Sequence, residues 1–208
     1  RSSDLTLTKA NFDISEIVVE LVESLEPLAA AKLQTITSFI DEDIELVADR
    51  QKLTQVVSNL VENAIKYSPE SAEISVSTSR VDDAAKVVIR DNGYGISQSD
   101  QDQIFEAFFR SRTEENWEVP GTGLGLALVK RIISMHGGSV DLRSEIGVGS
   151  VFTILLPVLT TSGVDESVVD PVEPDTISEE DIIEGNIRAR RSAMAKQKQQ
   201  VIESDEAA

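Results

Sequence analysis

The sequence predicts an α+β fold, a two-layer α/β sandwich in which helices cover one face of a mostly antiparallel or mixed sheet. Apolar residues recur at helical spacing in three segments, residues 13–31, 50–67 and 124–136. Short alternating or β-branched runs lie between and after these segments, and some of them follow one another directly. This order favours the sandwich over a parallel Rossmann sheet, in which strands and helices would alternate.

The first half of the chain begins with a helix expected over residues 13–31, with Asp13 as its capping residue. Residues 34–40 alternate and predict a strand. A second helix is expected over residues 50–67, because Ser68-Pro69 disfavours further helical backbone. The apolar positions of the two helices are Ile14, Ile17, Val18, Leu21, Val22 and Leu25, then Leu53, Val56, Val57, Leu60, Val61, Ala64 and Ile65.

The second half predicts a hairpin, one helix and two further strands. Residues 73–79 place Ile74, Val76 and Thr78 on one face, and the run at 86–90 follows after a polar loop at Asp82-Asp83. The helix at residues 124–136 is expected to end at Gly137-Gly138. The last two strands are expected over residues 140–144 and 150–156.

Composition divides the 208-residue chain near residue 158. Residues 159–208 carry twelve acidic and five basic side chains, two prolines and no aromatic residue, which is too little to build a core. We therefore predict a folded domain over residues 1–158 and an acidic, disordered tail over residues 159–208. A docking role for the tail is the alternative.

Composition also excludes several classes of function. The absence of cysteine excludes disulfides, thiolate metal sites and a cysteine nucleophile. A formal charge of -18 argues against nucleic acid as a partner, because phosphate backbones are held by excess lysine and arginine. No stretch approaches the ~20 apolar residues of a membrane-spanning helix, and no signal segment opens the chain at Arg1. We expect a soluble fragment of a larger protein.

Nine of the eleven glycines lie between residues 93 and 149, in four clusters. The cluster at residues 121–125 leads directly into the third expected helix. A glycine loop in this position presents backbone N–H groups and the positive end of a helix dipole, which together bind phosphate. The loop lacks the Lys-Ser/Thr ending of a P-loop, and an ordinary glycine-rich turn is the alternative interpretation.

One face of the second expected helix carries Asn59, Asn63 and Lys66 at i, i+4 and i+7. An amide oxygen can ligate Mg²⁺, which takes waters and phosphate oxygens as its other ligands. Lys66 can contact phosphate, and Tyr67 can pack on a base. On this feature alone, a solvated polar face is the competing interpretation.

Four segments, taken in order, resemble the N, G1, F and G2 boxes of sensor histidine kinases. They are residues 59–68 (NLVENAIKYS), 91–96 (DNGYGI), 105–110 (FEAFFR) and 121–126 (GTGLGL). The resemblance spans residues 5–157. It implies the Bergerat ATP-binding fold, shared with gyrase-type, heat-shock-chaperone and mismatch-repair ATPases.

The resemblance implies roles around adenine for the residues of the G1 box. Asp91 would accept a hydrogen bond from the adenine amino group, which selects adenine over guanine. Gly93 and Gly95 would let the backbone approach the base, next to Ile96. Tyr67 would contact the adenine side.

At the phosphate end, the resemblance implies that Asn63 ligates Mg²⁺ and that Asn59 contacts the phosphates and the metal-bound waters. Lys66 would contact phosphate. Arg110 would reach the terminal phosphate from the base of a lid formed by residues 111–120, which would order on nucleotide binding. The second glycine loop would cradle the phosphates with Gly121, Thr122, Gly123, Leu124, Gly125 and Leu126.

Asn59 also separates branches of this superfamily. In gyrase-type and chaperone relatives the equivalent position resembles a glutamate that activates water, whereas an amide cannot take a proton, so phosphoryl transfer is favoured over hydrolysis. Glu62 stays undecided between the cavity edge and a solvent-facing role. Phe105 is expected to be a core aromatic rather than a site residue.

The single histidine, His136, is expected at a helix end, where an imidazolium is favourable. We interpret it as a structural residue rather than a phosphoacceptor. The catalytic residues Asn59, Asn63 and Arg110 would then act on a histidine located elsewhere.

The expected function is that of the ATP-binding catalytic domain of a sensor histidine kinase, the cytoplasmic portion of a sensor that can be membrane-anchored. Its expected cofactors and partners are ATP, Mg²⁺, a histidine-bearing dimerisation domain in cis or trans, and a response regulator. The alternatives are a serine kinase of the anti-sigma-factor type, a relative of mitochondrial dehydrogenase kinases, and a module that binds nucleotide without transferring phosphate.

Overall fold

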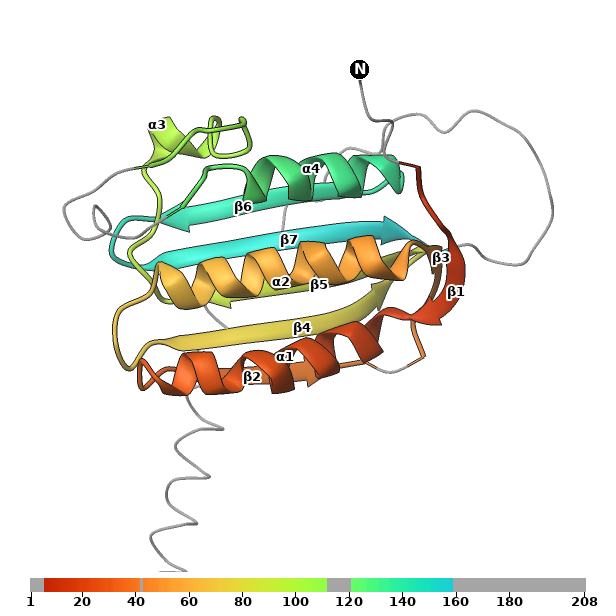
Figure 1. Cartoon of the computed structure of the whole chain (residues 1–208), viewed down its shortest axis with the longest axis horizontal. Coiled ribbons are helices and arrows are strands. Elements are labelled where there is room, and N and C mark those ends of the chain that lie inside the picture. The colour runs from red at the N-terminus through yellow and green to blue at the C-terminus, as the bar shows by residue number, and fades with distance from the viewer. Residues whose placement is uncertain (1–5, 42, 112–120, 159–208) are drawn as a thin grey trace, which may run out of the picture. The chain divides into compact units, whose positions relative to one another are not determined.

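The computed structural model describes residues 6–41, 43–111 and 121–158, and they form a five-stranded mixed sheet with helices on one face (Figure 1). The strand order is β2-β4-β5-β7-β6. β2 runs parallel to β4, and the other neighbouring pairs are antiparallel. The strands are β2 (Thr35–Ile40), β4 (Glu73–Val81), β5 (Ala84–Asp91), β6 (Ser139–Glu145) and β7 (Gly149–Pro157).

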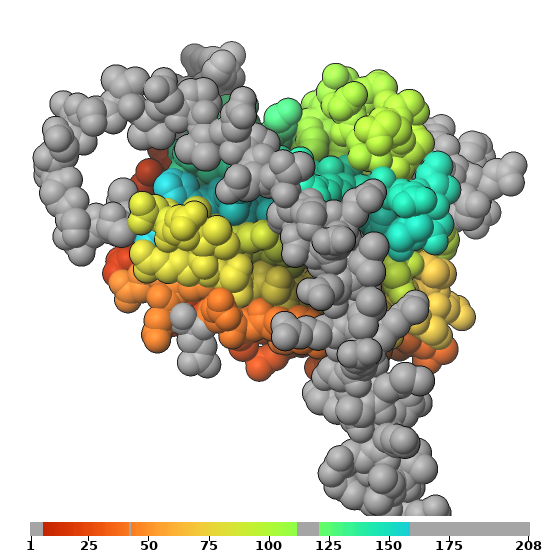
Figure 2. All heavy atoms as spheres, turned by 180° about the vertical axis from the view of Figure 1, so that it is seen from behind, coloured from red at the N-terminus to blue at the C-terminus, as the bar shows by residue number. Residues whose placement is uncertain are grey.

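Three helices, α1 (Ile14–Ala30), α2 (Arg50–Lys66) and α4 (Gly125–Met135), cover the sheet face that points to the viewer in Figure 1. α2 lies between the other two and packs on both. Figure 2 shows the opposite side, where atoms in the colours of β2, β4 and β7 are visible. The predicted α+β sandwich with helices on one face is therefore confirmed.

Three short elements were not predicted. β1 (Ala10–Asp13) pairs antiparallel with β3 (Glu45–Ala48) in a separate two-stranded sheet, and α3 (Gln98–Gln101) is a single turn that packs near β6. Elements of four residues are too short to show a periodic pattern. Their formation depends on contacts between segments that are distant in the sequence.

Aspartates cap the first two helices. The carboxylate of Asp13 accepts the backbone N–H of Ser15 at 2.9 Å, which confirms the predicted cap of α1. The carboxylate of Asp49 accepts the backbone N–H of Lys52 at 3.1 Å at the start of α2. Each bond satisfies one of the N–H groups that a helix start leaves without a partner.

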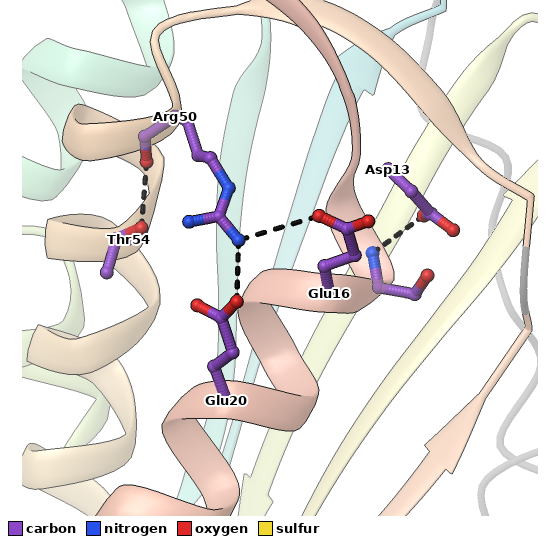
Figure 3. Close-up of polar contacts among 6 residues, drawn as sticks. Asp13, Glu16, Glu20, Arg50 and Thr54 are labelled. Atoms are coloured by element: carbon purple, nitrogen blue, oxygen red, sulfur yellow. Dashed lines mark hydrogen bonds and ion pairs between the residues drawn. The ribbon is translucent and has the colours of Figure 1, made fainter.

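Arg50 connects the start of α2 to α1 (Figure 3). Its guanidinium forms ion pairs with Glu20 at 2.8 Å and with Glu16 at 3.5 Å. These side chains are largely exposed, so solvent screens the pairs and they contribute little to stability. Apolar packing between the helices and the sheet is therefore the main source of stability.

Apolar packing also orients α2. All seven apolar positions predicted for its inner face are buried, and they belong to the same core as Ile74 and Val76 of β4. Thr78 of β4 is buried as well, as the alternation predicted. Since α2 turns its apolar side to the sheet, its polar row at Asn59 and Asn63 lies on another side of the helix.

The acidic tail and most of the lid, residues 159–208 and 112–120, lie outside the described residues. The domain boundary at residue 158 and the ordering of the lid therefore stay predictions. None of the described helices has the length and apolar character of a membrane span.

Candidate functional site

A cavity of about 360 Å³ lies beside α2, where residues of that helix, the turn after β5 and the loop before α4 meet. Residues from the segment after α3 and from β7 complete its lining. Thirteen of the fifteen residues predicted for the site line this cavity: Asn59, Asn63, Lys66, Tyr67, Asp91, Gly95, Ile96, Arg110, Gly121, Thr122, Gly123, Gly125 and Leu126. Folding thus gathers all four sequence motifs around one space.

The other two predicted residues, Gly93 and Leu124, are not part of the lining. Gly93 is buried, and a Cβ atom there would lie 2.4 Å from the carbonyl oxygen of Tyr67. Its role in this structure is to let the turn after β5 pack on the end of α2. Leu124 is exposed and directly precedes α4.

Asn59 faces the glycine loop with its amide oxygen. Its side-chain N–H donates to the carbonyl of Gln55 at 2.8 Å, one turn earlier in α2. A Cβ atom at Gly125 would lie 3.1 Å from Asn59 Oδ1, so the close approach depends on a residue without a side chain. An acceptor therefore lies beside the first turn of α4. Asn63 lines the cavity on the next turn of α2.

Lys66 and Arg110 bring two positive charges to the same cavity. Burial and then the charge of Arg110 lower the pKa of the Lys66 ammonium, and Glu62 partly opposes them. A Cβ atom at Gly121 would lie 3.1 Å from Lys66 Nζ, so the glycine loop passes close to this charge. An anion placed near both cations would relieve their mutual repulsion, which is the electrostatic condition of a phosphate site.

Asp91 is the buried acid of the cavity, with 8% of its surface exposed. Burial raises the pKa of its carboxyl group to about 6, although two hydrogen bonds oppose the shift. The backbone N–H groups of Gly93 and Ser150 donate to Oδ1 at 2.9 and 3.2 Å. Because both bonds go to Oδ1, Oδ2 is the oxygen that can accept a hydrogen bond from a ligand.

The turn between β6 and β7 supports the segment that follows Asp91. Gly95 has a φ of 73°, and a Cβ atom there would lie 1.9 Å from the carbonyl oxygen of Glu145. The backbone N–H of Ile96 donates to Ser144 Oγ at 2.8 Å. Gly149 has a φ of 122° and leaves room for the carbonyl of Asp91. These contacts explain why glycines occur both in the segment after Asp91 and in the turn between β6 and β7.

Eight lining residues were not predicted as site residues: Glu62, Ala64, Tyr94, Ile104, Phe109, Ser111, Ser150 and Phe152. Most of them are apolar or aromatic, and in the sequence they look like ordinary core residues. Phe105, expected in the core, packs its ring edge-on against Phe152 with the ring centres 6.5 Å apart. Phe109 lines the cavity, whereas Phe108 is exposed.

His136 is a buried residue outside this cavity lining, at the end of α4. Its Nδ1 lies 2.8 Å from the carbonyl oxygen of Ile132 and donates to it. Its Nε2 accepts the backbone N–H of Asp49 at 3.0 Å, which requires a neutral ring. The contacts support the structural interpretation, although with a neutral imidazole instead of the expected imidazolium.

A model of the histidine kinase-, DNA gyrase B-, and HSP90-like ATPases matches residues 48–160, more than half of the chain. The chain belongs to this ATPase family.

Within the family, the similar proteins are histidine kinases. The sensor-like histidine kinase SenX3 of Mycolicibacterium smegmatis is 36% identical over 145 residues, which cover 70% of this chain and 38% of SenX3. The catalytic domain of histidine kinase ThkA superposes with a TM-score of 0.64 at 28% identity, over 72% of this chain and 95% of that domain. This chain is thus the ATP-binding catalytic domain of the histidine kinase type, and the serine-kinase alternative is not favoured.

Two further structures contain bound molecules. Full-length ShkA in complex with AMPPNP superposes with a TM-score of 0.66 at 28% identity, over 77% of this chain and 33% of ShkA. ThkA in complex with the response regulator protein TrrA superposes with a TM-score of 0.64 at 25% identity, over 76% of this chain and 44% of that one. The chain spans less than two fifths of SenX3.

Proposed function

We propose that this chain binds Mg²⁺-ATP in the cavity beside α2 and transfers the γ-phosphoryl group to a histidine on a dimerisation domain outside this chain. One arrangement carries the proposal: a buried carboxylate, two amides, two cations and a glycine loop before a helix line a single cavity. The carboxylate is suited to adenine, and the other groups are suited to a triphosphate. ShkA, a similar protein, binds AMPPNP, an analogue of ATP.

Asp91 supports the choice of adenine. Its Oδ2 can accept a hydrogen bond from the exocyclic amino group, while Oδ1 is held by the N–H groups of Gly93 and Ser150. Guanine carries a carbonyl oxygen at that ring position, which would leave a buried carboxylate facing another acceptor. Ile96 and Ile104 add apolar surface to the lining.

The two amides that α2 brings to the cavity, those of Asn59 and Asn63, fit Mg²⁺. No group of three or more His, Cys, Asp or Glu side chains gathers for a metal within the described part of the chain, and Mg²⁺ bound with a nucleotide needs only one or two protein ligands. We assign the direct contact to the amide oxygen of Asn63. Asn59 Oδ1 would accept hydrogen bonds from waters bound to the metal. The metal, when bound, would neutralise phosphate charge.

The reaction forms a bond between an imidazole nitrogen of the acceptor and the γ-phosphorus. It breaks the bond between that phosphorus and the oxygen shared with the β-phosphate, and ADP leaves with the electron pair. The imidazole proton passes to solvent or to a base on the acceptor domain. Lys66 and Arg110 would stabilise the charge of the transferring group. Asn59 cannot take a proton from water, which favours transfer over hydrolysis.

The acceptor and the next partner lie outside this chain in our proposal. His136, the single histidine, uses both ring nitrogens in hydrogen bonds within the core. We therefore assign the acceptor to a dimerisation domain in cis or trans. A response regulator would then receive the phosphoryl group, by analogy with ThkA and TrrA. We place the domain in the cytoplasm, where ATP is available.

Titration calorimetry of the 208-residue chain tests the nucleotide part of the proposal. We expect binding of ATP with Mg²⁺, weaker binding with EDTA and no measurable binding of GTP. Equal affinity for GTP would exclude the role of Asp91 in adenine selection.

A labelling experiment tests the transfer step. The chain is incubated with γ-labelled ATP and the dimerisation segment of the parent protein, with a histidine-to-glutamine version as the control. We expect acid-labile label on the first acceptor and none on the second. Release of phosphate without label on the acceptor would support hydrolysis instead.

A further inference from the structure

The turn between α1 and β2 contacts the end of α2 through Lys32, a residue that does not line the cavity. Lys32 Nζ donates to the carbonyl oxygens of Ile65 and Ser68, both at 2.7 Å, and lies 3.5 Å from that of Lys66. The last carbonyl groups of a helix lack partners within the helix and carry the negative end of its dipole. The ammonium group of Lys32 donates hydrogen bonds to these carbonyl groups, and its positive charge interacts favourably with the negative end of the dipole.

Gln34, in the same turn and directly before β2, reinforces this contact. Its side chain is buried, and its Nε2 lies 3.0 Å from the carbonyl oxygens of Ile65 and Ser68 and 2.9 Å from that of Pro69. Two residues of one turn therefore hold the backbone at the point where α2 ends. Burial lowers the pKa of the Lys32 ammonium, and the negative charge of Glu70 partly opposes this shift.

The end of α2 is where the two parts of the cavity are joined. Lys66 and Tyr67 project from it into the lining. The carbonyl oxygen of Tyr67 accepts the backbone N–H of Tyr94 at 3.0 Å, and Gly93 packs against the same carbonyl. A shift of this helix end would move the cation of the phosphate end and the turn that follows Asp91 together.

We propose that Lys32 is a positioning residue for nucleotide binding. It holds the last turn of α2 so that Lys66, Tyr67 and the turn at Gly93 keep the geometry that ATP requires, without touching the nucleotide itself. This inference rests on the proposed position of ATP in the cavity. The proposed role requires a positively charged hydrogen-bond donor at the end of α2. Another cation of similar length should therefore preserve nucleotide binding, whereas an apolar side chain should not.

The test compares Lys32→Met with Lys32→Arg. We expect Lys32→Met, which keeps the apolar stem, to raise the Kd for Mg²⁺-ATP about tenfold, and Lys32→Arg to stay within about threefold of the unaltered chain. Lys9→Met removes the same charge from an exposed position and should change the Kd less than about twofold. If Lys32→Met does not fold, Lys32→Gln is measured in its place, because it removes the charge but keeps a side-chain hydrogen-bond donor.

Two further measurements separate positioning from general stability and from the proposed function. Ile17→Val removes one methyl group from the buried side of α1 and should lower the Tm without changing the Kd. In the ligand-free chain, amide hydrogen exchange at Lys66 and Tyr67 should become faster in Lys32→Met and not in Lys32→Arg.

Unchanged exchange in Lys32→Met would overturn the inference whether or not ATP binds. Faster exchange with an unchanged Kd would also overturn it, as would an equal rise of Kd in Ile17→Val. Failure of the unaltered chain to bind ATP would instead contradict the proposed function.

Discussion

The backbone N–H of Ser150 donates to the carboxylate of Asp91 at 3.2 Å, although 59 residues separate the two positions in the chain. The residues face each other in the antiparallel ladder between β5 and β7. The hydrogen bond orients a carboxylate that burial would otherwise keep protonated to a higher pH. Asp91 thus combines an unfavourable electrostatic environment with a fixed orientation toward the cavity.

Replacement of Asp91 by asparagine should weaken ATP binding. The asparagine Oδ1 can still accept from Gly93 and Ser150, but an amide N–H₂ then faces the adenine amino group. Loss of a hydrogen bond to a charged group costs about 1.5–3 kcal/mol, so we expect the Kd for ATP to rise roughly ten- to a hundredfold. Calorimetry at pH 7.5 measures this. An unchanged Kd would remove Asp91 from the adenine site.

The same substitution should stabilise the chain without nucleotide at neutral pH. The pKa of Asp91 is about 6 in the folded chain and 3.8 for a solvated aspartate, so the folded state binds the proton more tightly. The contribution of Asp91 to folding stability therefore falls as the pH rises from about 4 to 6 and stays low above 6. We expect Asp91→Asn to gain on the order of 1–3 kcal/mol at pH 7.5 and little at pH 4. Urea unfolding at both pH values provides the measurement, and a less stable variant at pH 7.5 would contradict it.

Lys66→Met should discriminate between the two ends of the nucleotide. Its ammonium group interacts with the charge of Arg110 and lies close to the glycine loop. Its loss should raise the Kd for Mg²⁺-ATP more than about threefold, the equivalent of more than about 0.6 kcal/mol. Binding of adenosine, which has no phosphate, should change little. Arg110→Ala should behave in the same way. Equal losses for ATP and adenosine would indicate a disturbed adenine end instead.

The isolated chain should incorporate no phosphoryl group on His136. Both ring nitrogens are engaged, with Asp49 and with Ile132, and the side chain is buried. His136→Ala should destabilise the fold by about 1–3 kcal/mol, because it leaves the backbone N–H of Asp49 without its acceptor, whereas the carbonyl of Ile132 keeps the backbone N–H of residue 136. Incubation with labelled ATP and urea unfolding test the two statements. Acid-labile label on His136 would require a different acceptor assignment.

Deletion of residues 160–208 should leave the affinity for Mg²⁺-ATP within about threefold. Acidic side chains in that segment would repel the nucleotide only through screened, long-range charge at physiological salt. The effect should be smaller than that of Lys66→Met or Arg110→Ala. A larger effect would place part of the tail against the nucleotide domain and move the predicted boundary at residue 158.

Local patterns in the chain were sufficient for the main helices, the long strands and the polar row on α2. The apolar spacing that predicted residues 50–67 as a helix also placed Asn59, Asn63 and Lys66 on a separate side of it. Both features depend on a repeat of 3.6 residues within one segment, so neighbouring residues carry the information. The family motifs likewise consist of short runs that can be read one at a time.

Tertiary contacts decided the rest. The raised pKa of Asp91 comes from its burial beside β7, and Gly93 supports the end of α2 instead of the cavity lining. Lys32 meets the carbonyl groups of Ile65 and Ser68 more than thirty residues away. Burial and hydrogen bonding depend on which segments the sheet brings together. A periodic pattern within one segment does not determine which other segments will lie beside it.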